Sequence, residues 1–363
     1  MADVERDAPA VSALRIQYDR GGVHLPELGL WLDPAQRQSG PEKVFVSHAH
    51  SDHIAAHREV ILTAPTARLM HSRLGGRRVE HVLPLGEPRA LDGGRVPYQL
   101  TLLPAGHILG SAMVWIEADG ESLLYTGDFK LRPGLCAERC EPRAADLLIM
   151  ETTFGQPEYE FPPAPGVMEQ IIRFCREALA GDATPALLCY SLGKSQELLA
   201  GLAGAGLPVA LHEATHKITR IYEQFGCRFP AYECLEANGA RRQVVICPPH
   251  SGAARALRRR VNTRAAIITG WALDPRCRYR YQADAAFPLS DHADFPELIE
   301  MVGRVAPKKV YTLHGCAADF AQTVRDLGID AQALSEPEQF FLALGRKGAR
   351  SGEASNDNTP RSR

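Results

Sequence analysis

This chain of 363 residues lacks several kinds of segment, and each absence narrows the possible protein classes. No apolar run approaches the roughly 18 residues that a membrane-spanning helix needs, so we expect no membrane partner. The first residues, MADVERDAPA, have neither a basic start nor an apolar segment, so we expect no secretory signal. We therefore predict a cytoplasmic protein.

The sequence also lacks a disulfide pattern and a strong net charge. Its nine cysteines are odd in number and scattered, which argues against a disulfide framework. Cys136 and Cys140 are four residues apart, but no second pair follows to complete a structural zinc site. The net charge of −2 indicates neither a nucleic-acid nor a membrane partner.

The pattern of apolar residues changes along the chain. Residues 1–155 read as short β-strands joined by turns. Helices and strands alternate after a proline-rich linker in 156–285, which predicts an open, largely parallel sheet. Strands that end in reactive residues return in 286–345, and 346–363 is expected to be a disordered tail. We therefore expect an α/β catalytic domain in two parts, split by an inserted α/β domain.

The expected strands are rich in Val, Ile, Leu or aromatic residues. In the catalytic domain they are 43–47, 98–103, 112–116, 122–126, 146–151 and 310–313. In the inserted domain the expected strands are 186–190, 209–212, 244–247 and 265–269, and the expected helices are 166–179, 194–202, 213–225 and 253–261.

The strongest chemical signal is the segment His48-Ala49-His50-Ser51-Asp52-His53, directly after an expected strand. Imidazole and carboxylate groups bind Zn²⁺ or Mn²⁺ in hydrolases. Four potential ligands are too many for one catalytic ion that keeps an open position, so the segment indicates two ions. A polar surface loop is the simpler interpretation, but further candidate ligands occur in order along the chain.

Those further candidates are His107, Asp128 and His314, each just past an expected strand. Adjacent glycines such as Gly127 permit a tight approach of the backbone. A lone histidine or aspartate at the end of a strand is more often structural. Together with the hexapeptide, however, these residues predict one metal site.

With these motifs the sequence resembles the metallo-β-lactamase superfamily, which implies an αββα sandwich and two divalent ions. Zn²⁺ is the expected metal, with Mn²⁺ or Mg²⁺ as alternatives. The ligands that the resemblance implies for the first ion are His48, His50 and His107. Those that it implies for the second ion are Asp52, His53 and His314.

The resemblance also implies roles for two more aspartates. Asp128 would bridge both ions, and together with Asp52 it is counted in the expected catalytic set. Asp33 matches the early aspartate of the fold and would support the ligand loop from behind. Carboxylates in such outer positions fix the orientation of a ligand.

The inserted domain has the size and position of the cap of the β-CASP nucleases, a group within that superfamily. Glu151 resembles the group's acidic motif just before the insertion, and Leu289–Phe295 resembles its histidine motif just after it. In that interpretation His292 stands beside the leaving oxygen of a phosphodiester. Glu151 would raise the pKa of His292, which makes the histidine a general acid.

The cap offers candidate nucleic-acid contacts. The segment with Ser191, Gly193 and Lys194 opens a helix after a strand, where free N–H groups attract anions. Other expected phosphate contacts are Ser290 and the basic run of Arg258, Arg259 and Arg260. The alternating Arg276, Arg278 and Arg280 indicate one face of a strand, and Trp271, Tyr279 and Tyr281 are candidates for stacking or for core packing.

Residues 14–345 as a whole resemble the bacterial DNA-ligase-associated exonucleases, which are relatives of Artemis. The resemblance implies a DNA exonuclease in repair or end processing, in functional association with a DNA ligase. His314 departs from the Artemis branch and is shared with the RNA-processing branch, so an RNA-processing endonuclease or exonuclease stays open. A small-molecule metallohydrolase and a non-catalytic scaffold are the remaining alternatives.

Overall fold

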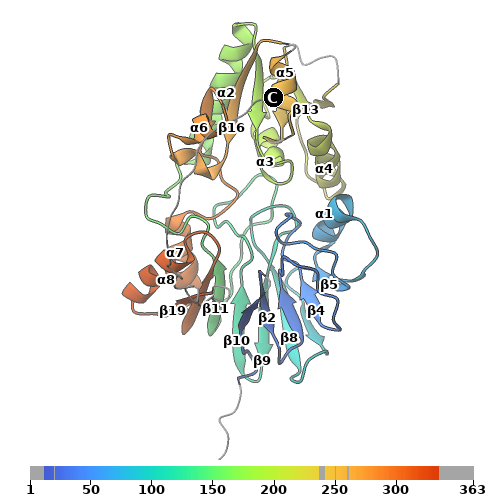
Figure 1. The fold of residues 1–363 in the computed structure, drawn as a ribbon, viewed down its shortest axis with the longest axis vertical. Helices are drawn as coiled ribbons and strands as arrows, with labels where there is room; N and C mark the ends of the chain where they lie inside the picture. The colour runs from blue at the N-terminus through green and yellow to red at the C-terminus, as the bar shows by residue number, and fades with distance from the viewer. Residues whose placement is uncertain (1–11, 20, 237–241, 250, 260, 335–363) are drawn as a thin grey trace, which may run out of the picture.

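The computed structural model describes residues 12–19, 21–236, 242–249, 251–259 and 261–334. Two facing sheets form the lower part of the molecule in Figure 1, and a third sheet with its helices forms the upper part. The tail expected at 346–363 and the candidate Arg260 lie outside the described residues. None of the described helices is long and apolar enough to span a bilayer.

The first sheet has six strands in the order β1-β2-β3-β4-β5-β6. They are Gln17–Asp19, Gly22–Leu25, Leu30–Leu32, Lys43–Phe45, Glu59–Leu62 and Val79–Val82. The second sheet has seven strands in the order β19-β18-β11-β10-β9-β8-β7. In chain order, β7 to β11 are Pro88–Leu91, Tyr98–Pro104, Ala112–Ala118, Glu121–Tyr125 and Leu147–Glu151, and β18 and β19 are Lys309–Leu313 and Asp330–Ala333.

Apolar side chains fill the space between these two sheets and also cover both outer faces. Leu32 and Phe45 of the first sheet and Val114 and Ile116 of the second share one fully buried cluster. Helix α1 (Ala64–Leu74) packs on the outside of the first sheet. Helices α7 (Phe295–Val305) and α8 (Ala317–Asp326) pack on the outside of the second. The arrangement is the expected αββα sandwich.

The third sheet is parallel throughout and has the order β14-β13-β15-β12-β16-β17. Its strands, β12 to β17, are Thr184–Leu188, Val209–Leu211, Tyr232–Cys234, Val244–Cys247, Thr263–Ile268 and Ala285–Phe287. The helices around it, α2 to α6 with the short 3₁₀ helix η1, are Ala164–Ala180, Lys194–Gly201, Glu213–Gln224, Ala253–Arg258, Cys277–Arg280 and Gly270–Leu273. This unit is called the cap below; the domain boundaries at 155 and 285 stay predictions.

An apolar cluster joins the cap to the sandwich. Leu69 of α1 and Ile108 of a sandwich loop pack there with Leu192, Ile221 and Tyr222 of the cap. Tyr222 is fully buried, and its hydroxyl accepts a hydrogen bond from the backbone N–H of a sandwich loop. Burial of this contact fixes the position of the cap above the loops that carry the histidines.

The parallel cap sheet and the expected strands around the reactive residues are confirmed, with shifts of no more than two residues at their ends. Helix α1 is a correction, because residues 1–155 were expected to contain strands only. A second correction concerns Arg276, Arg278 and Arg280, which lie in and beside the short helix α6 and not along a strand. Their spacing of two is too short a pattern to distinguish a strand from a single helical turn.

Candidate metal centre and cleft

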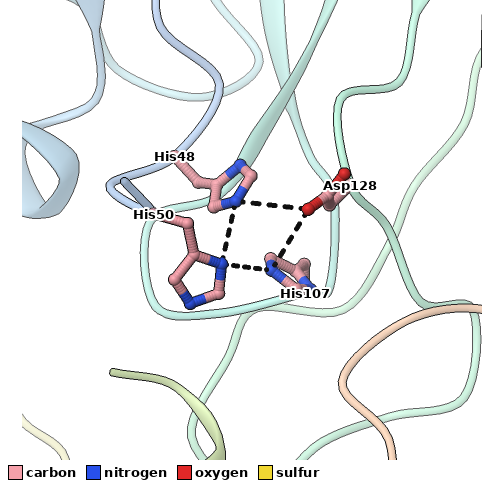
Figure 2. A group of neighbouring side chains, drawn as sticks. All are labelled: His48, His50, His107 and Asp128. Carbon is pink, nitrogen blue, oxygen red and sulfur yellow. Dashed lines mark hydrogen bonds and ion pairs between the residues drawn. The ribbon is translucent and has the colours of Figure 1, made fainter. Parts of the chain in front are cut away.

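Three imidazole nitrogens converge above the sandwich, together with one carboxylate (Figure 2). His50 Nδ1 lies 3.0 Å from His48 Nε2 and 3.0 Å from His107 Nε2. Ligand nitrogens of a tetrahedral zinc ion, with bonds of about 2.0–2.1 Å, lie roughly 3.3 Å apart, so the spacing fits a metal ion. The structure therefore contains a histidine–aspartate cluster that is able to bind metal.

The far side of these rings determines which nitrogen is available to a metal. His107 Nδ1 lies 2.8 Å from the carbonyl oxygen of Asp291, and His50 Nε2 lies 3.2 Å from that of Leu192. A carbonyl oxygen only accepts, so both of these nitrogens carry the hydrogen. The lone pairs of His107 Nε2 and His50 Nδ1 therefore face the centre, as in proteins with metal-bound histidine.

Burial keeps these rings neutral. Burial and neighbouring His292 lower the pKa of His107 to about 3. Burial and neighbouring His53 hold the pKa of His48 well below its ordinary value. Since only the neutral imidazole offers a lone pair to a metal, both rings are in the form that binds at neutral pH.

Asp128 lies at the centre of the histidines. Its Oδ2 atom is 3.4 Å from Nε2 of both His48 and His53, and 3.8 Å from Nε2 of His107. Burial works against the charged carboxylate, but His53 and its neighbours outweigh burial and hold the pKa of Asp128 well below its usual range. One ionised carboxylate thus reaches both expected groups of ligands, which is the geometry that a bridge requires.

The second expected group is more open than the first. Asp52 is exposed, and its Oδ2 lies 3.8 Å from His53 Nε2. The rings of His53 and His314 are 5.9 Å apart, centroid to centroid. His314 is exposed and has a positive φ of 60°, a backbone conformation that is uncommon for histidine and is found at functional sites. The structure assembles the first group tightly; in the second group His53 is buried, whereas Asp52 and His314 lie on the solvent side.

Asp33 faces away from the centre and holds the ligand loop. One of its carboxylate oxygens accepts hydrogen bonds from the Tyr125 hydroxyl, 3.0 Å away, and from the Ser47 hydroxyl. That oxygen also lies 2.9 Å from His53 Nδ1. Asp128 and Asp33 outweigh burial and raise the pKa of His53, so this ring is held where positive charge is favoured.

His292 pairs with Glu151 beside the cluster. The two oxygens of Glu151 lie 3.0 and 3.1 Å from His292 Nδ1, and His292 Nε2 lies 3.9 Å from Asp128 Oδ2. Burial works to lower the pKa of His292, but Glu151 and Asp128 outweigh it and raise that pKa to about 9. The pair therefore holds a proton on the imidazole next to the candidate metal centre.

The cap turn 190–194 reaches down to the sandwich at this point. The Lys194 ammonium pairs with the Asp291 carboxylate, and both side chains are buried. A Cβ on Gly193 would lie 2.3 Å from Ile108 Cγ2, so only glycine lets the turn approach this closely. These contacts between cap and sandwich fix the position of Leu192, whose carbonyl oxygen orients His50.

The expected anion site at the start of α3 is already satisfied within the protein. Gly193 N donates to the Gln196 side chain, and Ser195 N donates to the Tyr190 carbonyl oxygen. The charge of Lys194 is matched by Asp291. The sequence could not show this, because Asp291 lies far along the chain and in the other domain.

A cleft of about 440 Å³ opens between sandwich and cap above the cluster. Residues with expected roles that line it are His50, Asp52, Asp128, Ser191, Lys194, Trp271, Ser290 and His292. Residues that sequence reasoning missed are Arg73, Thr153, Phe154, Tyr190 and Asp291. Arg73 went unnoticed because helix α1 was not expected. It is exposed and forms no ion pair within 4 Å with any described residue.

The two described residues of the expected basic run, Arg258 and Arg259, do not line this cleft. Arg258 donates to the carbonyl oxygen of Gln282 and lies 3.8 Å from Asp284, and Arg259 is exposed beside it. Neither residue lines the cleft, and Gly193 is buried in the cap–sandwich contact. Such arginines are typical of a solvated surface.

Comparisons with known proteins identify the class. Residues 32–135 match the family model described as the metallo-beta-lactamase superfamily. Residues 283–334 match the model of a Zn-dependent metallo-hydrolase RNA specificity domain. Residues 32–135 are therefore similar to the metallo-β-lactamase superfamily, as the resemblance of the histidine motif implied.

Comparison with individual proteins gives more specific similarities than the family models do. The chain is 52% identical over 345 residues to a protein of Opitutus terrae named probable DNA ligase, covering 94% of this chain and 33% of that protein. It is 28% identical over 324 residues to the 5′ exonuclease Apollo of Gallus gallus, covering 86% of this chain and 68% of the relative. A structure of a protein of unknown function from Enterococcus faecalis V583 shares the fold, with a TM-score of 0.52 and 13% identity over 81% of this chain and 79% of that one.

The position of Asp128 predicts the effect of Asp128→Asn on bound metal. The amide keeps the shape of the side chain but removes the negative charge among the histidines. We expect metal affinity to fall by more than about 10-fold, measured by elemental analysis after dialysis. Asp319→Asn, in an exposed position of α8, is the control. Full metal occupancy in Asp128→Asn would contradict a bridging role.

The close approach of Gly193 predicts that Gly193→Ala weakens metal binding from the cap side. The added methyl group would collide with Ile108 and displace the Leu192 carbonyl oxygen from His50. We expect a loss of about 10-fold in metal affinity, measured by competition with a chelator. Gly204→Ala is the matched control, because Gly204 also has a positive φ, of 75°, but has open space around it. Equal affinity in the two variants would refute the coupling.

Proposed function

We propose that this chain is a metal-dependent DNA exonuclease that hydrolyses phosphodiester bonds in DNA repair or end processing. The observation that carries the proposal is the His292–Glu151 pair beside the histidine–aspartate cluster, on the floor of a cleft between two domains. A phosphodiesterase needs a nucleophile, neutralisation of phosphoryl charge and a proton for the leaving oxygen. The cluster and the pair together provide residues for all three.

The residues around the cluster fit two divalent cations, and Zn²⁺ is the proposed metal because imidazole nitrogens dominate the set. The proposed ligands are His48, His50 and His107 for one ion, Asp52, His53 and His314 for the other, and Asp128 for both. When bound, two such cations supply a water of lowered pKa and neutralise charge on the phosphoryl oxygens. Asp33 keeps the His53 ring oriented, and the cap turn does the same for His50.

His292 would act as the general acid. Its Nδ1–H is engaged by Glu151, so Nε2 is the atom that donates a proton to the departing oxygen. Glu151 is buried, and it also accepts the backbone N–H of Phe129 at 2.9 Å, which fixes its position. Ser191 and Ser290 line the cleft and are the proposed contacts to the nucleic-acid backbone, whereas Lys194 is paired with Asp291.

The comparisons support DNA as the substrate. The similar chicken protein is named a 5′ exonuclease, and a segment similar to this chain forms a third of a protein named a DNA ligase. Covalent attachment of such a segment supports a functional association with ligation. The cytoplasmic location stays a prediction.

RNA is the second candidate substrate, because residues 283–334 match a domain described by its RNA specificity. The test is digestion of end-labelled DNA and RNA of the same sequence, at equal metal and salt. We expect products from single-stranded or frayed DNA ends and slower cleavage of RNA. Added chelator should abolish cleavage. Preferential cleavage of RNA would assign the chain to RNA processing, and no cleavage of either strand would refute a nuclease.

The geometry of His292 predicts that His292→Ala keeps its metals but loses about 10²–10⁴-fold in the rate of cleavage. His292 is not one of the proposed metal ligands, so elemental analysis should show wild-type metal content. His216→Ala, a histidine of the cap that does not line the cleft, should cleave normally. Unchanged turnover in His292→Ala would exclude the general-acid role.

A further inference from the structure

Two exposed aromatic residues line the cleft, Tyr190 and Trp271. Trp271 belongs to the short helix η1 of the cap, is 38% exposed and, unlike Tyr190, packs against other aromatic rings of the described residues. Tyr279 is more exposed, at 67%, but lies outside the cleft and carries Arg278 over its ring. The part of the Trp271 ring that faces the cleft takes no part in core packing, so this surface is able to contact a ligand.

Other aromatic rings hold Trp271 from behind. Its ring centroid is 4.7 Å from that of Phe154 and 5.6 Å from that of Tyr159. Phe154 is almost fully buried and stacks edge-on against Phe161, 4.9 Å away. Because these rings restrict the indole on its inner side, little conformational entropy remains to be lost when a ligand covers its outer side.

The backbone beside Trp271 is adapted to this cluster. A Cβ on Gly270 would lie 2.5 Å from Phe154 Cζ and 2.9 Å from Phe161 Cζ. Glycine at 270 therefore lets the two phenyl rings pack directly beneath the segment that carries Trp271. The cap residue is thus fixed to a sandwich segment, since Phe154 follows closely after Glu151 and β11.

The same cluster connects Trp271 to the candidate general acid. Phe154 is a neighbour of both, with its ring centroid 4.7 Å from that of Trp271 and 6.1 Å from that of His292. The indole and the imidazole are therefore neighbours of one shared ring. Arg73 also lines the cleft and forms no ion pair within 4 Å with a described residue, so its charge is available to a phosphate.

From this arrangement we propose that Trp271 is a stacking platform for an unpaired nucleobase next to the scissile phosphate. The inference rests on the proposed nuclease function and adds the part of the substrate that is recognised. A flat indole accepts any base, because every base has a π-face, and it excludes a base that is paired within a duplex stack. The protein would therefore favour single-stranded or frayed ends.

The test compares wild type with Trp271→Ala on a single-stranded DNA oligonucleotide and on the same strand with abasic sites at the cleaved end. On the normal strand we expect Trp271→Ala to raise KM about 10-fold, with a small change in kcat. On the abasic strand the two proteins should be alike, because no base is left to stack. Trp271→Phe should restore most of the loss, and Tyr279→Ala should behave as wild type.

A binding experiment without cleavage tests this inference separately from the proposed function. Strands with phosphorothioate linkages, which resist hydrolysis, should quench tryptophan fluorescence in the wild type and not in Trp271→Phe. Absence of cleavage by the wild type would refute the nuclease proposal, while this quenching would still report on stacking. Stacking is refuted if the KM of Trp271→Ala equals that of the wild type on normal strands, or if it rises as much on abasic strands as on normal ones. It is also refuted if the fluorescence of Trp271→Phe is quenched as much as that of the wild type.

Discussion

A buried carboxylate surrounded by histidines is the interaction on which the rest of this structure depends. Oδ2 of Asp128 lies within 4 Å of Nε2 of His48, His53, His107 and His292. Transfer of a charge from water to such a site costs several kcal/mol, which nearby positive charge must offset. His53 and His292, whose pKa values are raised, supply part of that positive charge. The rings of His48 and His107 are neutral, so bound cations would supply the rest, and the surrounding loops keep the site in place for them.

The cap takes part in this assembly. Two of the three clustered histidines are oriented by carbonyl oxygens, one from the cap and one from Asp291, whose side chain is paired with Lys194 of the cap. Because these hydrogen bonds determine which nitrogen faces the metal, the docking of the cap and the affinity for metal are physically linked. Tyr222 and the apolar cluster around it hold the two domains at the distance that these bonds require.

Sequence reasoning found those parts of the site that are local in the chain. His48 and His50 stand two residues apart after a strand, and strands of the second sheet deliver Asp128 and His314 to the same edge. Contacts between distant segments left no pattern in the sequence. The carbonyl oxygens that orient the histidines belong to the backbone, which is the same in every residue type. Helix α1, and with it Arg73, was missed because proline and polar residues at its start obscure its periodicity.

The electrostatics of the cleft differ from those of an ordinary nucleic-acid groove. Lysine and arginine contribute two side chains to its lining, of which Lys194 is paired with Asp291, and the described Arg258 and Arg259 of the cap do not line it. The carboxylates of Asp52, Asp128 and Asp291 would repel a phosphate if no cations were bound. In the proposed nuclease, attraction for the backbone would therefore come mainly from bound cations, from Arg73 and from protonated His292. With so few phosphate contacts, base stacking would supply a substantial share of the affinity, and strand recognition would depend on an unstacked end more than on a long electrostatic track.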